Sequence, residues 1–132
     1  MKKIILSLLS VIAFSMPANH MNTKDPGLNM ALQGKYKEAL ANFIQRCSNG
    51  DGYACGMAGY LYDKGLGNIP KNHIVAIKFY KKGCNLNDGD SCTLLGYEAY
   101  KNKDNQKAKE YLEKGCKLGN KDACKYLKKI KI

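Results

Sequence analysis

The sequence predicts an all-α fold, specifically an α/α solenoid of helix-turn-helix repeats. The first observation is that all six cysteines fall into three C-x7-C pairs. Their first members, Cys47, Cys84 and Cys116, lie 37 and then 32 residues apart, a period typical of helical repeat proteins. The second is that an alanine stands eight residues before each of them, with a bulky apolar residue midway. The third is that no segment shows the apolar-polar alternation of a β-strand.

The first 18 residues have the pattern of a secretory signal peptide. Lys2 and Lys3 precede an apolar run over 4–14, and small residues follow it. Cleavage is expected after Ser15 or Ala18, which leaves a repeat domain over 19–132. The run is too short to cross a bilayer, so we expect no membrane span in the mature chain. The alternative is a short buried helix.

The helices are expected in the following order. Asp25 and Pro26 suit the N-cap and first position of a short helix that Gly34 ends. Helices over 36–47 and 53–64 follow, separated by a glycine-containing turn. A loop over 65–70 leads to Asn72, a candidate N-cap for a helix that reaches Cys84. Helices over 90–101, over 104–116 with Asp104 or Asn105 as cap, and over 122–130 complete about six helices in antiparallel hairpins.

Each helix has one apolar face at helical spacing, and these faces predict the core. Alanines recur where helices must approach closely, and Gly59 and Gly96 serve the same purpose on the partner helix although glycine lowers helix propensity by ~1 kcal/mol. The lysines of the last helix fit a solvated face that ends the array. The expected inward residues are Ala39, Leu40, Phe43, Cys47, Cys55, Ala58, Tyr62, Ala76, Ile77, Tyr80, Cys84, Cys92, Leu95, Ala99, Ala108, Tyr111, Leu112 and Cys116.

The cysteines are expected to form three disulfides, each across one turn. Antiparallel neighbours joined by a short turn can place two Cα atoms within the roughly 4.4–6.8 Å that a disulfide requires. Each bridge would stabilise the fold by roughly 2.5 kcal/mol in the chain-entropy model. A structural zinc site is the alternative, but C-x7-C is not a zinc spacing, and His20 and His73 fit no ligand pattern. We expect no metal or cofactor. The predicted pairs are Cys47–Cys55, Cys84–Cys92 and Cys116–Cys124.

The net charge is +11, or about +9 without Lys2 and Lys3. Such a charge favours acidic partners, namely anionic lipid, acidic polysaccharide or acidic protein. Nucleic acid is not expected as a partner of an exported protein. The alternative is that the lysines only keep a small exported protein in solution.

The glycines, tyrosines and alanines of 58–84 resemble the Sel1-like repeat, a relative of the tetratricopeptide repeat. The motif reads Ala58-Gly59-x-x-Tyr62-x-x-Gly65-x-Gly67, followed by Ala76-x-x-x-Tyr80-x-Lys82-Gly83-Cys84. With C-x7-C added, 29–130 resembles the cysteine-rich proteins of Helicobacter and their Campylobacter-type relatives. The third unit departs from the pattern, since it lacks the G-x-G loop and has Ala99 where the family has tyrosine.

This resemblance implies penicillin binding and weak β-lactamase activity, and hence antibiotic resistance. The residues themselves do not indicate that chemistry, because a serine β-lactamase requires Ser-x-x-Lys. Ser48 and Ser91 are the only serines after the signal peptide, both are expected in turns, and neither has lysine three residues on. We therefore name no catalytic residue.

A binding module in the periplasm or outside the cell fits the sequence better. The helix that contains the second cysteine of each pair has another face, which begins two residues after that cysteine. This face carries Met57, Tyr60 and Lys64 in one helix and Leu94, Tyr97 and Lys101 in the next. In related repeats this helix lines the concave surface. Tyrosines flanked by lysines there would hold an acidic protein, an extended peptide or a cell-wall-derived glycan. The alternative is that Tyr60 and Tyr97 pack between repeat units.

Overall fold

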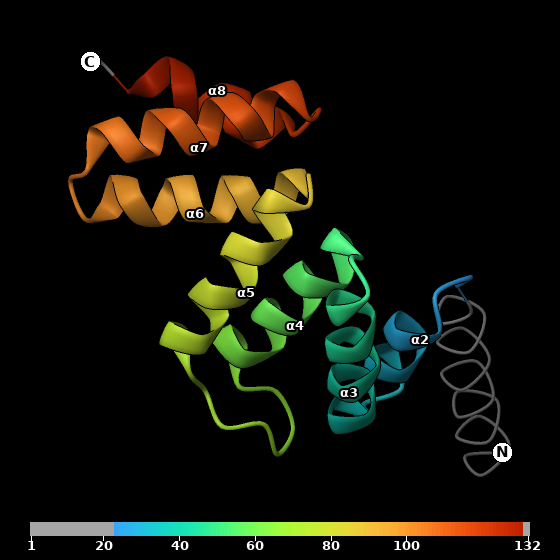
Figure 1. Cartoon of the computed structure of the whole chain (residues 1–132). Helices are drawn as coiled ribbons and strands as arrows, with labels where there is room; N and C mark the ends of the chain where they lie inside the picture. Colours follow the sequence, from blue (N-terminus) through green and yellow to red (C-terminus); the bar gives the residue numbers. More distant parts are fainter. Residues whose placement is uncertain (1–22, 131–132) are drawn as a thin grey trace, which may run out of the picture.

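The computed structural model describes residues 23–130, and within them it contains seven α-helices and no strand (Figure 1). The predicted signal peptide lies outside the described residues. Each helix packs on the next in the chain, which gives the expected all-α solenoid. Across residues 23–130, no helix combines the length and apolar character needed to cross a membrane. The helices are α2 (Pro26–Leu32), α3 (Tyr36–Ser48), α4 (Gly52–Lys64), α5 (His73–Asn85), α6 (Gly89–Lys101), α7 (Asn105–Lys117) and α8 (Lys121–Lys129).

Side-chain caps fix where most of these helices begin. An aspartate or asparagine precedes every helix except α3, and its side chain accepts a hydrogen bond from the backbone N–H three residues later. This confirms the caps predicted at Asp25, Asn72 and Asp104. Helices α4, α6 and α8 begin one residue earlier than predicted, because the turn itself supplies their caps. The six caps are Asp25, Asp51, Asn72, Asp88, Asp104 and Asn120.

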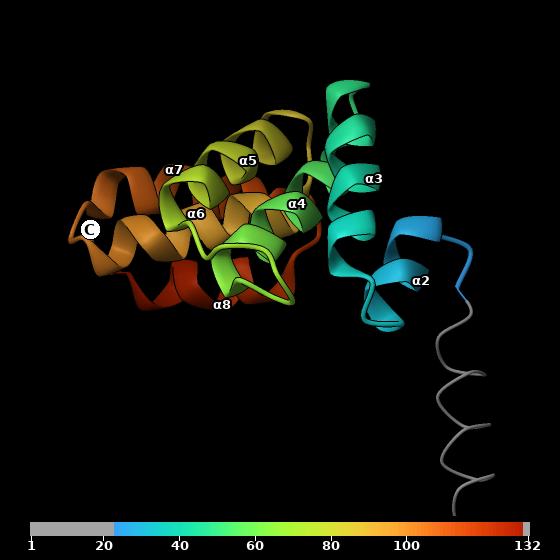
Figure 2. The same cartoon turned by 90° about the horizontal axis from the view of Figure 1, so that it is seen from below.

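The helices alternate between two sides of the solenoid. Helix α6 contacts α4 and α8 as well as its chain neighbours α5 and α7. In Figure 2, α4 and α6 lie beneath α5 and α7. Helices α2 and α3 lie at the end of the molecule that is farther from α7. Helices α4, α6 and α8 therefore share the inner side, where successive helices approach each other.

Three glycines allow the paired helices to approach closely. A Cβ atom built on each would lie 2.6–2.7 Å from a large buried side chain of the next helix, so only glycine fits. This confirms the packing roles predicted for Gly59 and Gly96, whereas the sequence analysis missed Gly27. The pairs are Gly27 with Phe43, Gly59 with Tyr80, and Gly96 with Leu112.

The short helix α2 packs on α3 in the place of an inner helix. Gly27 precedes Phe43 by the same interval as Gly96 precedes Leu112, so α2 corresponds to the second half of α6. Where the first half of such a helix would pack, α3 has Arg46 instead of a glycine. Its guanidinium bonds to Asp25 at 2.8 Å and to Asp51 at 2.9 Å, which fastens α2 and the start of α4 to α3.

The other end of the solenoid carries charge in place of glycine. Lys128 of α8 occupies the register of Gly59 and Gly96, and its side chain is exposed. Lys125 and Lys129 are exposed beside it, as predicted for a solvated face. Helix α8 thus lacks the glycine that lets α5 pack closely on α4.

Most of the predicted inward residues are buried, and five of them are only partly buried. Their positions lie at the margins of the helix contacts, where the apolar face meets solvent. Tyr62, for example, stacks on Phe79 with ring centroids 5.8 Å apart instead of entering the core. The sequence analysis also missed Ala54, Leu61 and Ile69, which are buried. The five partly buried residues are Leu40, Tyr62, Ile77, Tyr111 and Cys116.

Candidate binding surface

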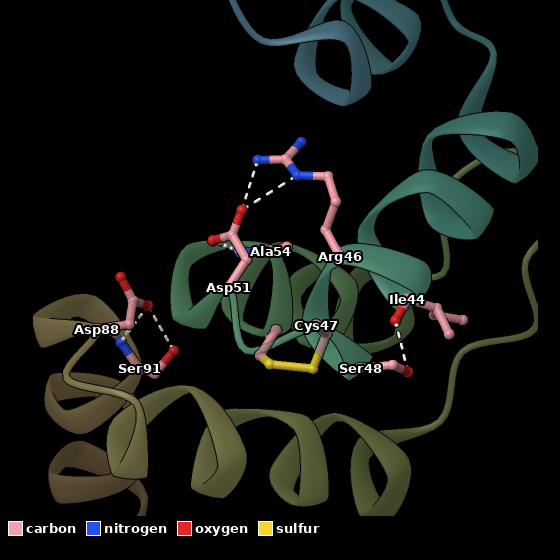
Figure 3. The surroundings of a disulfide bond; sticks show 9 residues. Ile44, Arg46, Cys47, Ser48, Asp51, Ala54, Asp88 and Ser91 are labelled. Carbon is pink, nitrogen blue, oxygen red and sulfur yellow. Dashed lines mark hydrogen bonds and ion pairs between the residues drawn. A yellow bond between two sulfur atoms is a disulfide. The ribbon is translucent and has the colours of Figure 1, made fainter.

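All six cysteines are bonded in pairs across the three turns that the C-x7-C spacing defines. Cys47 is joined to Cys55, Cys84 to Cys92 and Cys116 to Cys124, with Cα atoms 4.6, 4.6 and 4.7 Å apart. Figure 3 shows the first of these bonds between the end of α3 and the start of α4. Each bond thus anchors one inner helix, α4, α6 or α8, to the helix before it. None of the cysteines remains as a thiol.

The two serines lie in helices, not in the turns where the sequence analysis placed them. Ser48 is the last residue of α3, and its hydroxyl donates to the carbonyl of Ile44 at 3.1 Å. Ser91 is fully buried in the first turn of α6 and donates to the Asp88 carboxylate at 2.6 Å (Figure 3). Burial raises the pKa of Asp88. Ser91 thus completes the cap of α6, with its hydroxyl bonded to the capping carboxylate.

Each inner helix carries a lysine over a tyrosine ring, in the same register in α4 and α6 and in a different register in α8. The lysine Nζ lies 5.9 Å from the ring centroid in α4, 5.1 Å in α6 and 5.8 Å in α8. These distances suit a cation–π contact, which holds the lysine over the ring. Tyr97 and Tyr126 also lie together, with centroids 5.7 Å apart. The pairs are Tyr60 with Lys64, Tyr97 with Lys101, and Tyr126 with Lys129.

The structure places the six predicted surface residues on one face of α4 and α6. Tyr60, Leu94 and Tyr97 are 41%, 40% and 42% exposed, so these side chains are not enclosed in the core. Lys64 and Lys101 are exposed and Met57 is partly buried. The prediction missed the continuation of this face onto α8. The repeat register could have predicted this continuation. When Cys124 is aligned with Cys92, Tyr126 corresponds to Leu94 and Lys129 corresponds to Tyr97.

Three hollows follow one another along this face, and together they form what we call the concave groove. The first has a volume of about 130 Å³, the central one about 630 Å³ and the last about 230 Å³. Leu94 lines the first and central hollows, and Tyr97 lines the central and last ones. The shared side chains show that the three hollows are neighbours in a row across α4, α6 and α8.

His73 joins two carboxylates inside the central hollow. Its Nδ1 lies 2.8 Å from Asp63 of α4, and its Nε2 lies 3.0 Å from Glu98 of α6. The hydrogen bond to Asp63, followed by that to Glu98, raises the pKa of His73. The hydrogen bond from His73 lowers the pKa of Glu98 in turn. His73 therefore links the inner helices of two consecutive helix pairs.

Further bonds complete this cluster. The Tyr80 hydroxyl donates to Asp63 at 3.3 Å, and Lys101 lies 3.3 Å from Glu98. Burial raises the pKa of Tyr80, which therefore stays protonated. His73 fits no metal-ligand pattern in the sequence, and its meeting with these two carboxylates was not predictable, because they stand on different helices and at unrelated spacings. Within residues 23–130, no group of three or more His, Cys, Asp or Glu residues is arranged to hold a metal ion.

The comparison with protein families agrees with this architecture. The family model of the Sel1 repeat matches residues 52–88 and 89–120, which together span just over half of the 132 residues. The chain belongs to the Sel1 repeat family. No curated protein matches the chain.

The matched boundaries show how the disulfides relate to the Sel1 repeats. One repeat consists of α4 and α5, and the next consists of α6 and α7. The C-x7-C spacing alone groups the helices differently, with one pair on either side of each bonded turn. The Cys84–Cys92 bond instead joins one Sel1 repeat to the next. Within a repeat the two helices are in more extensive contact than across the junction. The covalent bonds therefore stand where the noncovalent packing is smaller.

Proposed function

We propose that this Sel1 repeat protein is a binding module that holds an extended acidic peptide segment of a partner protein in the concave groove. Sel1 repeats generally mediate protein interactions. The observation that carries the proposal is the tyrosine–lysine pair repeated on α4, α6 and α8. Tyr60 and Tyr97 each leave about two fifths of their surface in solvent, so both rings are accessible to a ligand.

An extended chain fits the shape of this surface better than a compact ligand. The hollows form a row instead of one deep pocket, and an aromatic ring borders each of them. Lysines line the central and last hollows, whereas Asp88 and Asp90 line the first. Tyrosine gives a large rigid contact area with little loss of conformational entropy, which suits the centre of an interface. The excess of lysine over acidic residues attracts a partner of opposite charge.

The proposed location is outside the cytoplasm, either in the periplasm or in the medium. Three disulfides in a small domain are typical of an oxidising compartment. A signal peptide over 1–18, cleaved after Ser15 or Ala18, would deliver the chain there. The resemblance to the cysteine-rich proteins of Helicobacter and Campylobacter is consistent with this location. The geometry of Ser48 and Ser91 does not favour the penicillin hydrolysis that the resemblance implies, so we do not propose it.

Selection from a phage-displayed library of random dodecapeptides tests the proposal. We expect the oxidised wild-type protein to enrich related sequences and the variant carrying Tyr60→Ala and Tyr97→Ala to lose them. Truncating a central aromatic side chain typically weakens binding by more than ~1 kcal/mol, so affinity should fall at least about tenfold. Ile74→Ala is the matched control, because Ile74 is 73% exposed on α5 and does not line the groove.

Two outcomes would contradict the proposal. Enrichment that is indifferent to the tyrosines would move the binding surface elsewhere. Failure to enrich any peptide, together with binding to acidic polysaccharides on a glycan array, would replace the peptide with a glycan.

A further inference from the structure

The charges of the central hollow are not evenly matched. Both of its carboxylates already have partners within the protein. Asp63 accepts from Tyr80 and pairs with His73, and Glu98 pairs with His73 and Lys101. While His73 is protonated, a ligand therefore finds no acidic group in this hollow that lacks a counter-charge.

Two lysines of the same hollow have no such partner. Lys64 comes from the end of α4, and Lys71 comes from the loop before α5. Within residues 23–130, no carboxylate lies within 4.0 Å of either ammonium group. Lys64 is held over the Tyr60 ring instead, at 5.9 Å. The unmatched charge of the hollow is therefore positive.

Apolar side chains line the hollow beside these lysines. Ile77 is partly buried, and Leu94 and Tyr97 each expose about two fifths of their surface. An anion held by Lys64 and Lys71 would thus lie next to an apolar wall. A peptide matches both features when it places an acidic group beside an apolar side chain.

We propose that the central hollow selects the peptide by receiving one of its carboxylates between Lys64 and Lys71, and that protonation of His73 strengthens this binding. This inference rests on the proposed function and names the chemical group that the groove recognises. The apolar neighbour of that carboxylate packs on Leu94 and Tyr97. A neutral peptide of the same shape lacks the partner that the two lysines require.

The role of His73 follows from the charges that face it. When His73 is protonated, the hollow carries four cations against two carboxylates, and loss of the proton removes one cation. The raised pKa of His73, caused by its bonds to Asp63 and Glu98, keeps this proton in place at mildly acidic pH. An anionic ligand is therefore held less tightly as the pH rises. The groups that line the hollow around His73 and carry or can acquire charge are Asp63 and Lys64 of α4, Lys71 before α5, Tyr80 of α5, and Tyr97, Glu98 and Lys101 of α6.

The dodecapeptide selection can separate this inference from the proposed function. At about pH 5.5 we expect the wild type to enrich Asp or Glu at one fixed position next to an apolar residue. The variant with Lys64→Gln and Lys71→Gln should bind a selected peptide about two- to tenfold more weakly, as expected for two exposed ion pairs. Lys78→Gln with Lys81→Gln is the matched control, because these exposed α5 lysines change the net charge equally and lie outside the hollow.

Fluorescence anisotropy of a selected peptide then tests His73. As the pH rises from about 5.5, below the ordinary histidine pKa, through the raised pKa of His73, wild-type affinity should fall by about two- to fivefold. His73→Gln should show no such change. Enriched peptides without a fixed acidic position, or equal losses in both lysine variants, would overturn the carboxylate site but leave peptide binding intact. A pH-independent wild type would overturn the role of His73, and failure to enrich any peptide would instead refute the proposed function.

Discussion

The Cys84–Cys92 bond provides the sharpest test of how the solenoid is stabilised. It joins the two matched Sel1 repeats at the centre of the molecule, and both cysteines are buried. Replacing both with alanine removes the cross-link and leaves each helix, cap and glycine contact in place. In the chain-entropy model, a closed loop of about nine residues stabilises the native state by roughly 2.5 kcal/mol. Loss of sulfur packing adds to this figure.

A matched bond exists at the end of the array. Cys116 and Cys124 enclose a loop of the same length, but both residues are only partly buried. If chain entropy dominates, the two double-alanine variants should lose similar amounts of stability. If packing dominates, the central variant should lose clearly more. The wild type under reducing conditions is the control, because it loses the cross-links but retains the sulfur atoms.

Urea unfolding followed by far-UV circular dichroism measures the effect. A loss of about 2.5 kcal/mol is large compared with the 5–15 kcal/mol that stabilise a typical domain. We expect the native helical signal to survive, because capping and packing hold the helices. A loss of less than about 1 kcal/mol would refute the reasoning, since the bond would then add little to the packing at the repeat junction. Collapse of the helical signal in native buffer would refute it in the opposite direction.

Two further predictions concern packing and pH. Gly96→Ala should lower the free energy of unfolding by about 1 kcal/mol. The added Cβ atom would lie 2.6 Å from the Leu112 side chain and 3.3 Å from the Leu112 backbone nitrogen, and this crowding costs more than alanine gains in helix propensity. Urea unfolding measures the effect, and a stabilised variant would contradict the prediction. Protonated His73, bonded to Asp63 and Glu98, should add under about 1 kcal/mol of stability below about pH 6.5. This contribution should be lost as the pH rises through the raised pKa of His73 in the folded protein. Unfolding of the wild type and His73→Gln at several pH values measures this, and a constant difference would contradict it.

Repetition made much of the fold predictable from the sequence. The cysteine register appears three times, so one alignment of the units places the turns, the helices and the close contacts of Gly59 and Gly96. The caps at Asp25 and Asn72 were recognisable because capping depends on a few consecutive residues. The same register would also have extended the candidate surface to Tyr126, had it been followed onto the last helix.

Other features depend on residues that only the folded chain brings together. His73 meets Asp63 and Glu98 because three helices converge, and no spacing in the sequence marks that convergence. Arg46 likewise replaces a glycine of the register only because α2 is too short to fill the space beside it. Both residues depart from the repeated pattern, so the comparison of units that located the core could not assign them a role.

The disulfides and the concave groove depend on the same geometry. Each inner helix carries part of the groove, and a cysteine in its first turn is bonded to the preceding helix. A cross-link across a repeat junction limits how far one inner helix can turn relative to the next, and His73 adds a second link between α4 and α6. Successive tyrosine–lysine pairs are therefore held at set positions before a ligand arrives. An extended ligand that contacts several pairs at once then loses less free energy to ordering the protein, which is the advantage of a preorganised surface.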